Sequence, residues 1–248
     1  MRKLNKSKKI NLINAALFLF ACIILWIRST NSPLLRALLQ EDGPFENIQA
    51  VLYFLAGLGL LLIYIKNSRN WWYLPLSLLL IWLAGEEISW GQRIFSIASP
   101  AWELKDNVQG EMNLHNINGI HQHIRLAGVL FCIFYFVVIP FLNEYFAKIR
   151  SFIAKFKLPV YPIWGELVMI IGISVMVYDR GILLRKDTQM TEIAETFISI
   201  GMFFFFLSEY WLTSNGKGKK LDAYINIFSP ICILLGIFFG LLHTAWPS

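Results

Sequence analysis

Seven long runs of apolar residues follow one another along the chain, separated by polar connections. Each run has about 18 to 21 residues, and at about 1.5 Å per residue each can cross a hydrocarbon core of about 30 Å. The predicted spans are residues 10–27, 47–65, 71–90, 125–143, 161–178, 192–211 and 223–243. The pattern therefore predicts an all-α, polytopic transmembrane helix bundle of about seven spans, forming a single integral membrane domain over residues 1–248.

Composition and charge agree with a membrane protein. Hydrophobic residues make up 56% of the chain and charged residues 15%, against about 25% charged in typical soluble domains. Of the 22 Lys and Arg residues, 14 fall in alternate connections, which the positive-inside rule places in the cytoplasm. We therefore expect a cytoplasmic N-terminus and an extracytoplasmic C-terminus in a bacterial inner (plasma) membrane. The net charge of +6 then indicates topology, and a nucleic-acid partner is not expected.

The longest connection, residues 91–124, joins the third and fourth predicted spans on the outer side. It begins with RIFSIASPAWEL, whose mixture of aromatic, aliphatic and charged residues predicts a short interfacial helix or a re-entrant segment. All four histidines and 12 of the 16 acidic residues fall on this side. The three cysteines lie inside predicted spans, which argues against a disulfide framework. Candidate chemistry is thus concentrated at the outer face.

Two adjacent carboxylates, Glu86 and Glu87, end the third predicted span in the stretch LAGEEISWGQRIF. If that helix starts at Trp71, Glu86 lies roughly 22 Å along it, short of the far edge of a core about 30 Å thick. Ionisable groups at that depth usually face a polar cavity or a partner. A plainer alternative is a helix that ends at the interface, with both carboxylates in headgroup water.

On a continuous helix, Glu86, Ser89, Trp90 and Arg93 would form one stripe, and Glu87 would point about 100° away. We therefore expect the two carboxylates to have different partners. One would serve a catalytic or metal site. The other would pair with an arginine, for which the sequence offers Arg93, Arg125 or Arg180.

A second polar stretch, NVQGEMNLHNINGIHQH at residues 107–123, is rich in amides and imidazoles, and neutral imidazole is a common metal ligand. On a helix His121 and His123 would lie about 200° apart and could not share an ion, although in an extended segment they could. His243, at the end of the last span, is expected at the same outer level. The alternative is an interfacial loop whose polar groups hydrogen-bond one another and the headgroups.

The other acidic residues have ordinary explanations. Glu192 and Glu195 are expected in the first turns of the sixth span, favoured by the helix dipole and with Thr191 as cap. Glu166 and Glu209, near cytoplasmic span ends, can be neutralised by neighbouring Lys and Arg. In a carrier they could instead form part of a proton path.

GEEISWGQRIF followed by NVQGEMNLHN resembles a group of bacterial multi-span membrane proteins in which both stretches recur, preceded by a segment like EDGPFEN. That resemblance covers about the central third of the chain and implies no particular activity. The layout is also loosely similar to seven-span hydrolases of the alkaline ceramidase and adiponectin receptor type, whose zinc site uses three histidines. This chain departs from them in having no HxxxH in its last span and no His in its second or third.

The main hypothesis is an outward-facing intramembrane hydrolase or transferase acting on a lipid or lipid-linked substrate. His115, His243 and one of His121 or His123 would bind zinc or another divalent metal, with Glu86 or Glu87 as general base. A metal-free version keeps a Glu and His pair. The alternatives are a non-catalytic envelope scaffold that docks a partner, and a proton-coupled transporter. The expected partners are membrane lipids and a lipid or lipid-linked substrate, and the sequence identifies no protein partner.

Further candidate residues complete the expected site. Arg93 would bind an anionic headgroup, since a guanidinium matches phosphate geometry. The other expected substrate-binding residues are Trp90, Gln92, Asn113 and Asn116, and the secondary candidates are Glu46, Glu111, Arg125, Asp179 and Arg180.

Overall fold

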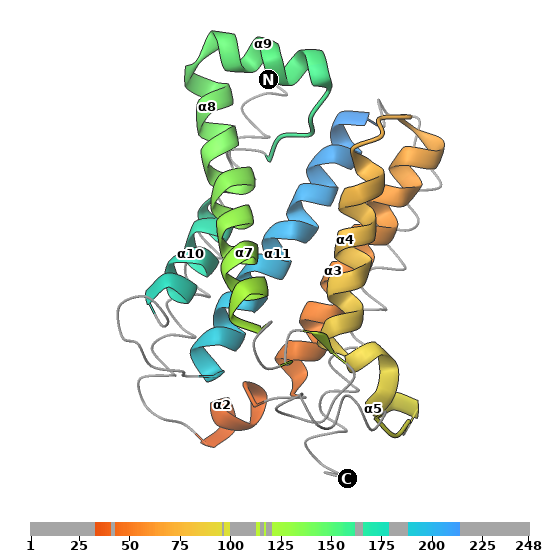
Figure 1. Ribbon diagram of the computed structural model, residues 1–248, viewed down its shortest axis with the longest axis vertical. Helices are drawn as coiled ribbons and strands as arrows, with labels where there is room; N and C mark the ends of the chain where they lie inside the picture. Colours follow the sequence, from red (N-terminus) through yellow and green to blue (C-terminus); the bar gives the residue numbers. More distant parts are fainter. Residues whose placement is uncertain are drawn as a thin grey trace, which may run out of the picture.

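The computed structural model describes residues 33–40, 43–95, 97–99, 113–114, 117, 121–161, 166–178 and 188–213. Within these ranges every regular element is helical. The elements are α2 (Pro33–Leu38), α3 (Pro44–Lys66), α4 (Tyr73–Glu87), η1 (Ser89–Gly91), α5 (Gln92–Phe95), α7 (His121–Ile133), η3 (Phe134–Val138), α8 (Ile139–Tyr145), α9 (Ala147–Phe156), α10 (Glu166–Val177) and α11 (Thr188–Thr213). Figure 1 shows the longer helices side by side in a bundle, with α9 across one end and the short α2 and α5 at the other.

Three helical stretches are long and apolar enough to cross a membrane, namely Pro44–Lys66, Leu126–Tyr145 and Met190–Tyr210. They correspond to the second, fourth and sixth predicted spans, so these three are confirmed as long apolar helices. The third and fifth predicted spans correspond to shorter helices, α4 with 15 residues and α10 with 12. The first and seventh, residues 10–27 and 223–243, lie outside the described residues.

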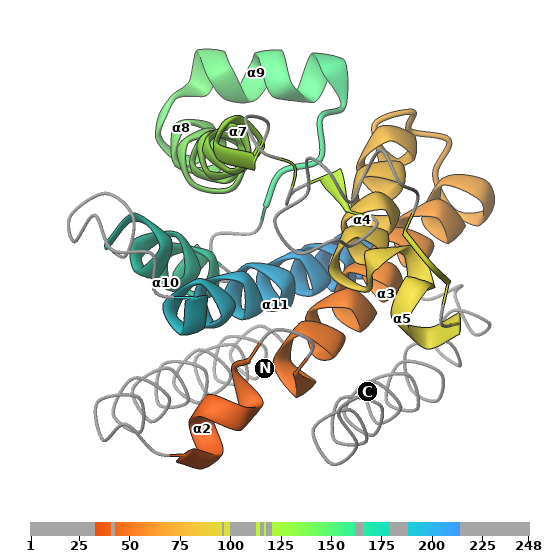
Figure 2. The same cartoon turned by 60° about the horizontal axis from the view of Figure 1, so that its bottom comes forward.

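Neighbouring helices pack in a fixed order. α3 lies between α4 and α11, α11 also contacts α10, and α10 contacts α7 and η3 (Figure 2). Within the apolar windows, 56% of α3 and 61% of α11 are buried inside the protein, whereas Leu126–Tyr145 has only 22% buried. α3 and α11 therefore form the centre of the described bundle, and the α7–α8 helix presents a broad apolar face to its surroundings.

α7, η3 and α8 form one continuous rod whose middle turn is a π-helix at Phe134–Val138. Pro140 follows two residues later. A proline inside a helix cannot donate a hydrogen bond, and its ring crowds the carbonyl four residues earlier. The wider π turn accommodates that ring, which explains why the rod continues through Pro140.

Close helix approach in the centre depends on glycine. A Cβ atom at Gly57 would lie 3.0 Å from the Ser77 carbonyl oxygen and 2.8 Å from Ile81 on α4. A Cβ atom at Gly59 would overlap the Phe206 ring on α11. Small residues allow such backbone contact between membrane helices. The Ser77 hydroxyl uses it to donate a 2.8 Å hydrogen bond to the Gly57 carbonyl.

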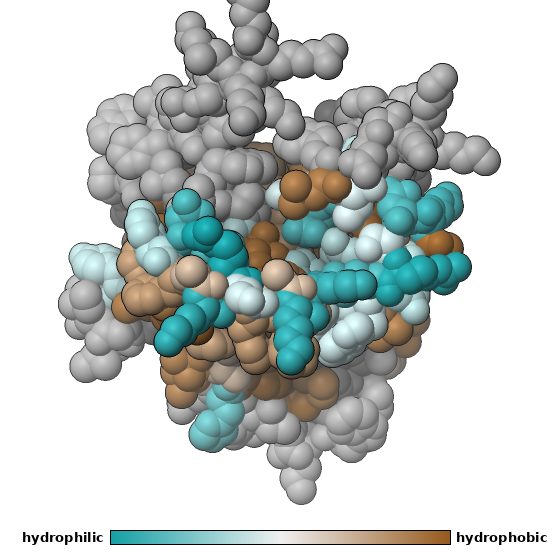
Figure 3. Space-filling view, turned by 90° about the horizontal axis from the view of Figure 1, so that it is seen from above, coloured by the Kyte–Doolittle hydropathy of each residue, from teal (hydrophilic) through white to brown (hydrophobic). Residues whose placement is uncertain are grey.

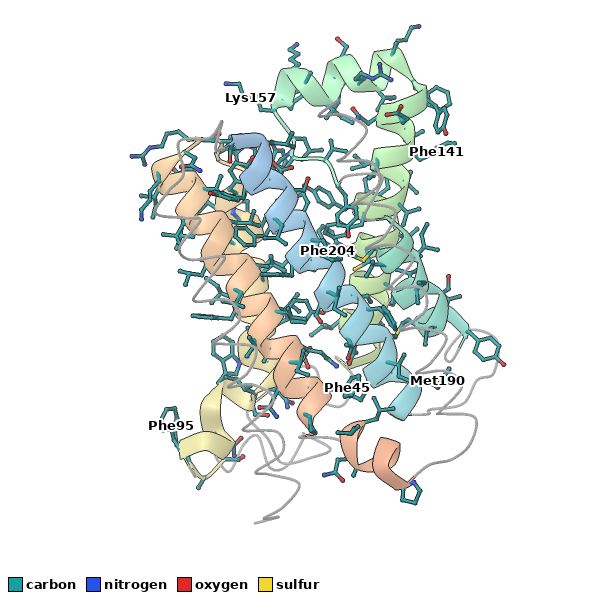
Figure 4. All side chains as sticks on the ribbon, turned by 180° about the vertical axis from the view of Figure 1, so that it is seen from behind. Phe45, Phe95, Phe141, Lys157, Met190 and Phe204 are labelled. Carbon is teal, nitrogen blue, oxygen red and sulfur yellow. The ribbon has the colours of Figure 1, made fainter. Side chains whose placement is uncertain are left out.

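The two ends of the bundle differ in charge. The basic end carries Lys66, Arg69, Lys148, Lys155 and Lys157, and hydrophilic side chains cover much of it in Figure 3. The acidic end carries Glu46, Glu86, Glu87, Glu192 and Glu195. Figure 4 shows the separation: Lys157 and Phe141 mark the basic end, and Phe45, Phe95 and Met190 mark the acidic end.

We predict that Gly57→Leu lowers the free energy of unfolding by about 1–3 kcal/mol, because the new side chain must push α4 away from α3. Gly128→Leu is the matched control, since a Cβ atom added at Gly128 on α7 would meet nothing within 4 Å in the described part of the chain. Unfolding of both variants in detergent measures the difference. Equal stability of the two variants would contradict the close contact.

Candidate functional site

A left-handed turn follows the end of α4. Ser89, Trp90 and Gly91 all have positive φ, at 46°, 53° and 79°. Only glycine adopts this region freely, and each non-glycine residue there costs roughly 1–2 kcal/mol. The helix ends at Glu87, so the continuous stripe expected over residues 86–93 is wrong. The chain instead turns back through a 2.8 Å hydrogen bond from the Gly91 N–H to the Ile88 carbonyl.

Trp90 folds back onto the helix that precedes it. Its indole Nε1 donates to Glu86 Oε1 at 2.9 Å. Its ring lies over Gly85, where a Cβ atom would approach the indole carbons to 2.9 Å. These two contacts offset the conformational cost of the left-handed turn. They also explain why Glu86 follows Gly85 directly and why Trp90 stands five residues after that glycine.

Glu86 also holds the second polar stretch. Its Oε2 accepts a 2.7 Å hydrogen bond from the Leu114 N–H, and Asn113 Nδ2 donates to the Ser89 hydroxyl at 3.2 Å. The stretch GEEISWGQR therefore meets Asn113 and Leu114 of the second polar stretch in space. Glu86 is only 3% exposed, and both of its oxygens accept hydrogen bonds. Its described contacts are those of a structural anchor.

A second group of polar side chains lies between α3 and α11. The Gln49 amide, fully buried, directs its Nε2 at three acceptors: the Glu192 carbonyl at 3.2 Å, Glu192 Oε2 at 3.0 Å and Thr196 Oγ1 at 3.0 Å. Thr196 Oγ1 donates in turn to the Glu192 carbonyl at 2.8 Å. The Gln49 Oε1 atom is buried and has no hydrogen-bond partner among the described residues. A buried acceptor normally has one, so this atom is suited to a ligand or water.

Glu87 of α4 lies near this group. The carboxylates of Glu87, Glu192 and Glu195 all lie close enough to the buried phenol of Tyr53 to interact with it electrostatically. These residues come from three helices, α3, α4 and α11. We call Gln49, Tyr53, Glu87, Glu192, Glu195 and Thr196 the carboxylate cluster. The expectation that the two adjacent glutamates have different partners stays a prediction.

The expected helix start at Glu192 is wrong. α11 begins at Thr188, so Thr191 lies inside the helix and is buried instead of capping it. The helix extends further because it packs along α3, and this packing buries Glu192 at the contact. At the basic end, Glu209 Oε2 accepts a 2.6 Å hydrogen bond from the Tyr73 hydroxyl, so a phenol partners the carboxylate for which Lys or Arg was expected.

The structure shows where several of the expected binding residues lie. Gln92 donates to the Ser99 hydroxyl, Trp90 is half exposed beside its bond to Glu86, and Glu46 lies in the first turn of α3. Of the histidines, His123 is exposed on α7. His121, Arg93 and Arg125 belong to helices, but their side chains lie outside the described part. The remaining candidates lie wholly outside it: His115, His243, Asn116, Glu111, Asp179 and Arg180.

Metal ligands do not gather in the described part of the chain, where no group of three or more His, Cys, Asp or Glu is arranged to hold an ion. The residues that sequence reasoning missed are Gln49, Tyr53 and Thr196. The sequence does place Gln49 and Tyr53 on one helix face, because they stand four residues apart. It places Glu192 and Thr196 on one face of another helix for the same reason. Nothing in the sequence indicates that these two helix faces pack against each other.

Comparison of the chain with models of protein families, with curated proteins and with solved structures finds no match. The class of protein therefore rests on the structure itself. The described chain is all-helical, with three helices long and apolar enough to cross a membrane and with polar groups buried between them.

We predict that Glu86→Gln loosens the 113–114 segment, because glutamine offers one acceptor where two donors, Trp90 Nε1 and the Leu114 N–H, now point. A hydrogen bond to a charged group contributes about 1.5–3 kcal/mol, and one of the two is lost here. Hydrogen exchange at the Leu114 amide should accelerate in this variant. Glu144→Gln, an exposed change on α8, is the control. Unchanged exchange in Glu86→Gln would contradict the anchoring role.

Proposed function

We propose that this protein is an integral membrane enzyme, a hydrolase or transferase, that acts on a lipid or lipid-linked substrate at the acidic end of its bundle. The observation that carries the proposal is that two adjacent glutamates have different surroundings. Glu86 is hydrogen-bonded into the loop, whereas Glu87, like Glu192 and Glu195, lies near enough to the buried Tyr53 phenol to interact with it electrostatically. Several carboxylates inside an apolar bundle, beside an amide oxygen with no partner in the described chain, are expensive, and such groups usually serve a function.

In the proposed site, the carboxylates near Tyr53 act together on the substrate. Neighbouring carboxyl groups tend to hold a proton between them, so that one can act as a base while another acts as an acid. Glu87 would accept a proton from the attacking water or acceptor hydroxyl. Glu195, less buried than Glu192, would return a proton to the leaving oxygen. Gln49 Oε1 would accept a hydrogen bond from the substrate.

Large apolar side chains near this end support a lipid substrate. Phe95, Ile97 and Leu126 are all more than half exposed, on α5, just after it and on α7. A substrate that entered from the bilayer would meet apolar surface before it reached the carboxylates. The basic connections gather at the opposite end, and on the positive-inside rule that end is cytoplasmic, so the proposed site faces outward from a bacterial inner membrane.

A divalent metal, with zinc as first candidate, belongs to the proposal through His115, His243 and one of His121 or His123. Carboxylates at the same end are compatible with such a site, and Glu87 would lie beside it as a base. Elemental analysis of purified protein beside His115→Ala and His243→Ala measures this part separately. Metal lost in both variants supports it, and metal-free active protein would overturn it.

A proton-coupled carrier is the second candidate, favoured by Glu209. This carboxylate is buried at the basic end and accepts a 2.6 Å hydrogen bond from Tyr73. A carrier needs ionisable groups at both ends, whereas an enzyme needs only the carboxylate cluster. Glu209→Gln therefore separates the two: it should abolish transport but leave turnover of a lipid substrate unchanged.

We predict that Glu87→Gln lowers turnover at least about 100-fold, the usual contribution of a general base, with little change in stability. Wild-type protein reconstituted in vesicles of phosphatidylethanolamine, phosphatidylglycerol and extracted bacterial lipids would be assayed by mass spectrometry of its products. Glu144→Gln serves as the charge-matched control.

Full turnover by Glu87→Gln would overturn the assignment of the base. An absence of any lipid conversion by the wild-type protein, together with lowered stability of Glu87→Gln, would favour a scaffold role for the carboxylate cluster.

A further inference from the structure

α9 combines a strongly apolar face with a basic one. Ile149, Phe152, Ile153 and Phe156 recur at the spacing of one helix face. Lys148 and Lys155 stand seven residues apart and project from the flank of that face, with Ser151 between them. This pattern is typical of helices that lie in the plane of a membrane interface.

The position of α9 fits such a role. It lies across the basic end of the bundle at a steep angle to α8 (Figure 1). Arg150 fixes the corner, since its Nε donates to the Asn143 carbonyl at 2.8 Å and its Nη2 to the Glu144 carbonyl. This leaves Lys148 and Lys155 as the basic side chains on the flank of the apolar face.

The far end of α9 is tied to the connection between α3 and α4. Trp72 Nε1 donates to the Phe156 carbonyl at 3.0 Å, and Asn70 Nδ2 donates to the Lys157 carbonyl at 2.6 Å. With both ends attached, the helix cannot rotate freely about its axis. The direction of its apolar face is therefore set by the bundle.

Within the described part of the chain, only a portion of that apolar face is covered by protein. Ile153 is buried against the bundle, but Phe152 is 61% exposed and Phe156 48% exposed, with ring centroids 4.7 Å apart. On α8, Phe141 and Tyr145 form a second exposed ring pair, also 4.7 Å apart. Exposed aromatic side chains thus stand both on α8, in one of the helices long enough to cross a membrane, and on α9, and hydrocarbon is the medium that would cover both.

We propose that α9 lies in the headgroup layer and binds anionic phospholipid. Phe152 and Phe156 enter the acyl region, and Lys148 and Lys155 reach the phosphate level with their apolar stems along the same surface. Seven residues of helix separate the two ammonium groups' attachment points by about 10 Å, a span that suits one large headgroup or two neighbouring phosphates. This lipid site on α9 is independent of the chemistry proposed for the acidic end.

The preference of the protein for anionic over zwitterionic lipid tests the role proposed for Lys148 and Lys155. Delipidated full-length protein would be titrated with phosphatidylglycerol or phosphatidylcholine, and bound lipids counted by native mass spectrometry. Wild-type protein should prefer phosphatidylglycerol, and Lys148→Gln with Lys155→Gln should lose about fivefold in that preference for each lysine, roughly 25-fold for the pair. The control is Lys66→Gln with Arg69→Gln, which removes equal charge from the same end but leaves α9 intact.

An equal loss of preference in the control pair would overturn a site on α9, because it would mean that only the total charge matters. So would an unchanged preference in the Lys148 and Lys155 pair. The variants must first match wild-type protein in unfolding temperature, which their exposed positions favour.

The depth of α9 in the membrane tests the role proposed for its apolar face. Nitroxide labels at Phe152→Cys and Ser151→Cys would be placed in a chain whose 3 native cysteines are replaced, then reconstituted in bilayer discs containing phosphatidylglycerol. The Phe152 label should be relaxed more by oxygen, and the Ser151 label more by a water-soluble nickel chelate. Preferential relaxation of the Phe152 label by the chelate would overturn the proposal and indicate a surface open to water or to a protein partner.

Discussion

A carboxylate buried in an apolar helix bundle must find hydrogen-bond donors, and Glu86 finds them by reshaping the chain around it. One oxygen accepts from Trp90 Nε1 and the other from the Leu114 N–H. The first bond holds the indole against the end of α4, which stops at Glu87 and continues through a left-handed turn. The second brings a residue 28 positions later onto the same helix end. The described path of the chain at the acidic end follows from this one side chain.

The adjacent residue, Glu87, has a different role in the proposed site. Glu87 of α4 lies near Tyr53 of α3, beside the place where Gln49 meets Glu192 and Thr196 of α11. Close packing of α3 against α4 and α11, made possible by Gly57 and Gly59, keeps these polar groups together. The proposed acid–base chemistry depends on that convergence, and the proposed lipid contact of α9 holds the opposite end in the interface.

Periodicity and run length were sufficient to predict the helices over residues 47–65, 125–143 and 192–211, because hydrocarbon thickness dictates a long apolar run. They could not predict the turn after Glu87, since Ser89 and Trp90 have no intrinsic preference for positive φ and adopt it only through tertiary contacts. Nor could they pair Gln49 with Glu192, which lies 143 residues away. The expected chemistry of Glu86 was assigned from its depth alone, which does not distinguish an anchor from a reactive group.

The separation of an anchoring glutamate from a functional one is tested most directly by the relative reactivity of Glu86 and Glu87 toward an apolar carbodiimide in reconstituted protein, resolved by peptide mass spectrometry. We expect Glu87 to be modified at least several-fold faster than Glu86, whose two oxygens are occupied by Trp90 and Leu114. Glu144, exposed on α8, reports the reactivity of an open carboxylate. Modification of Glu86 at a rate equal to or above that of Glu87 would contradict this separation.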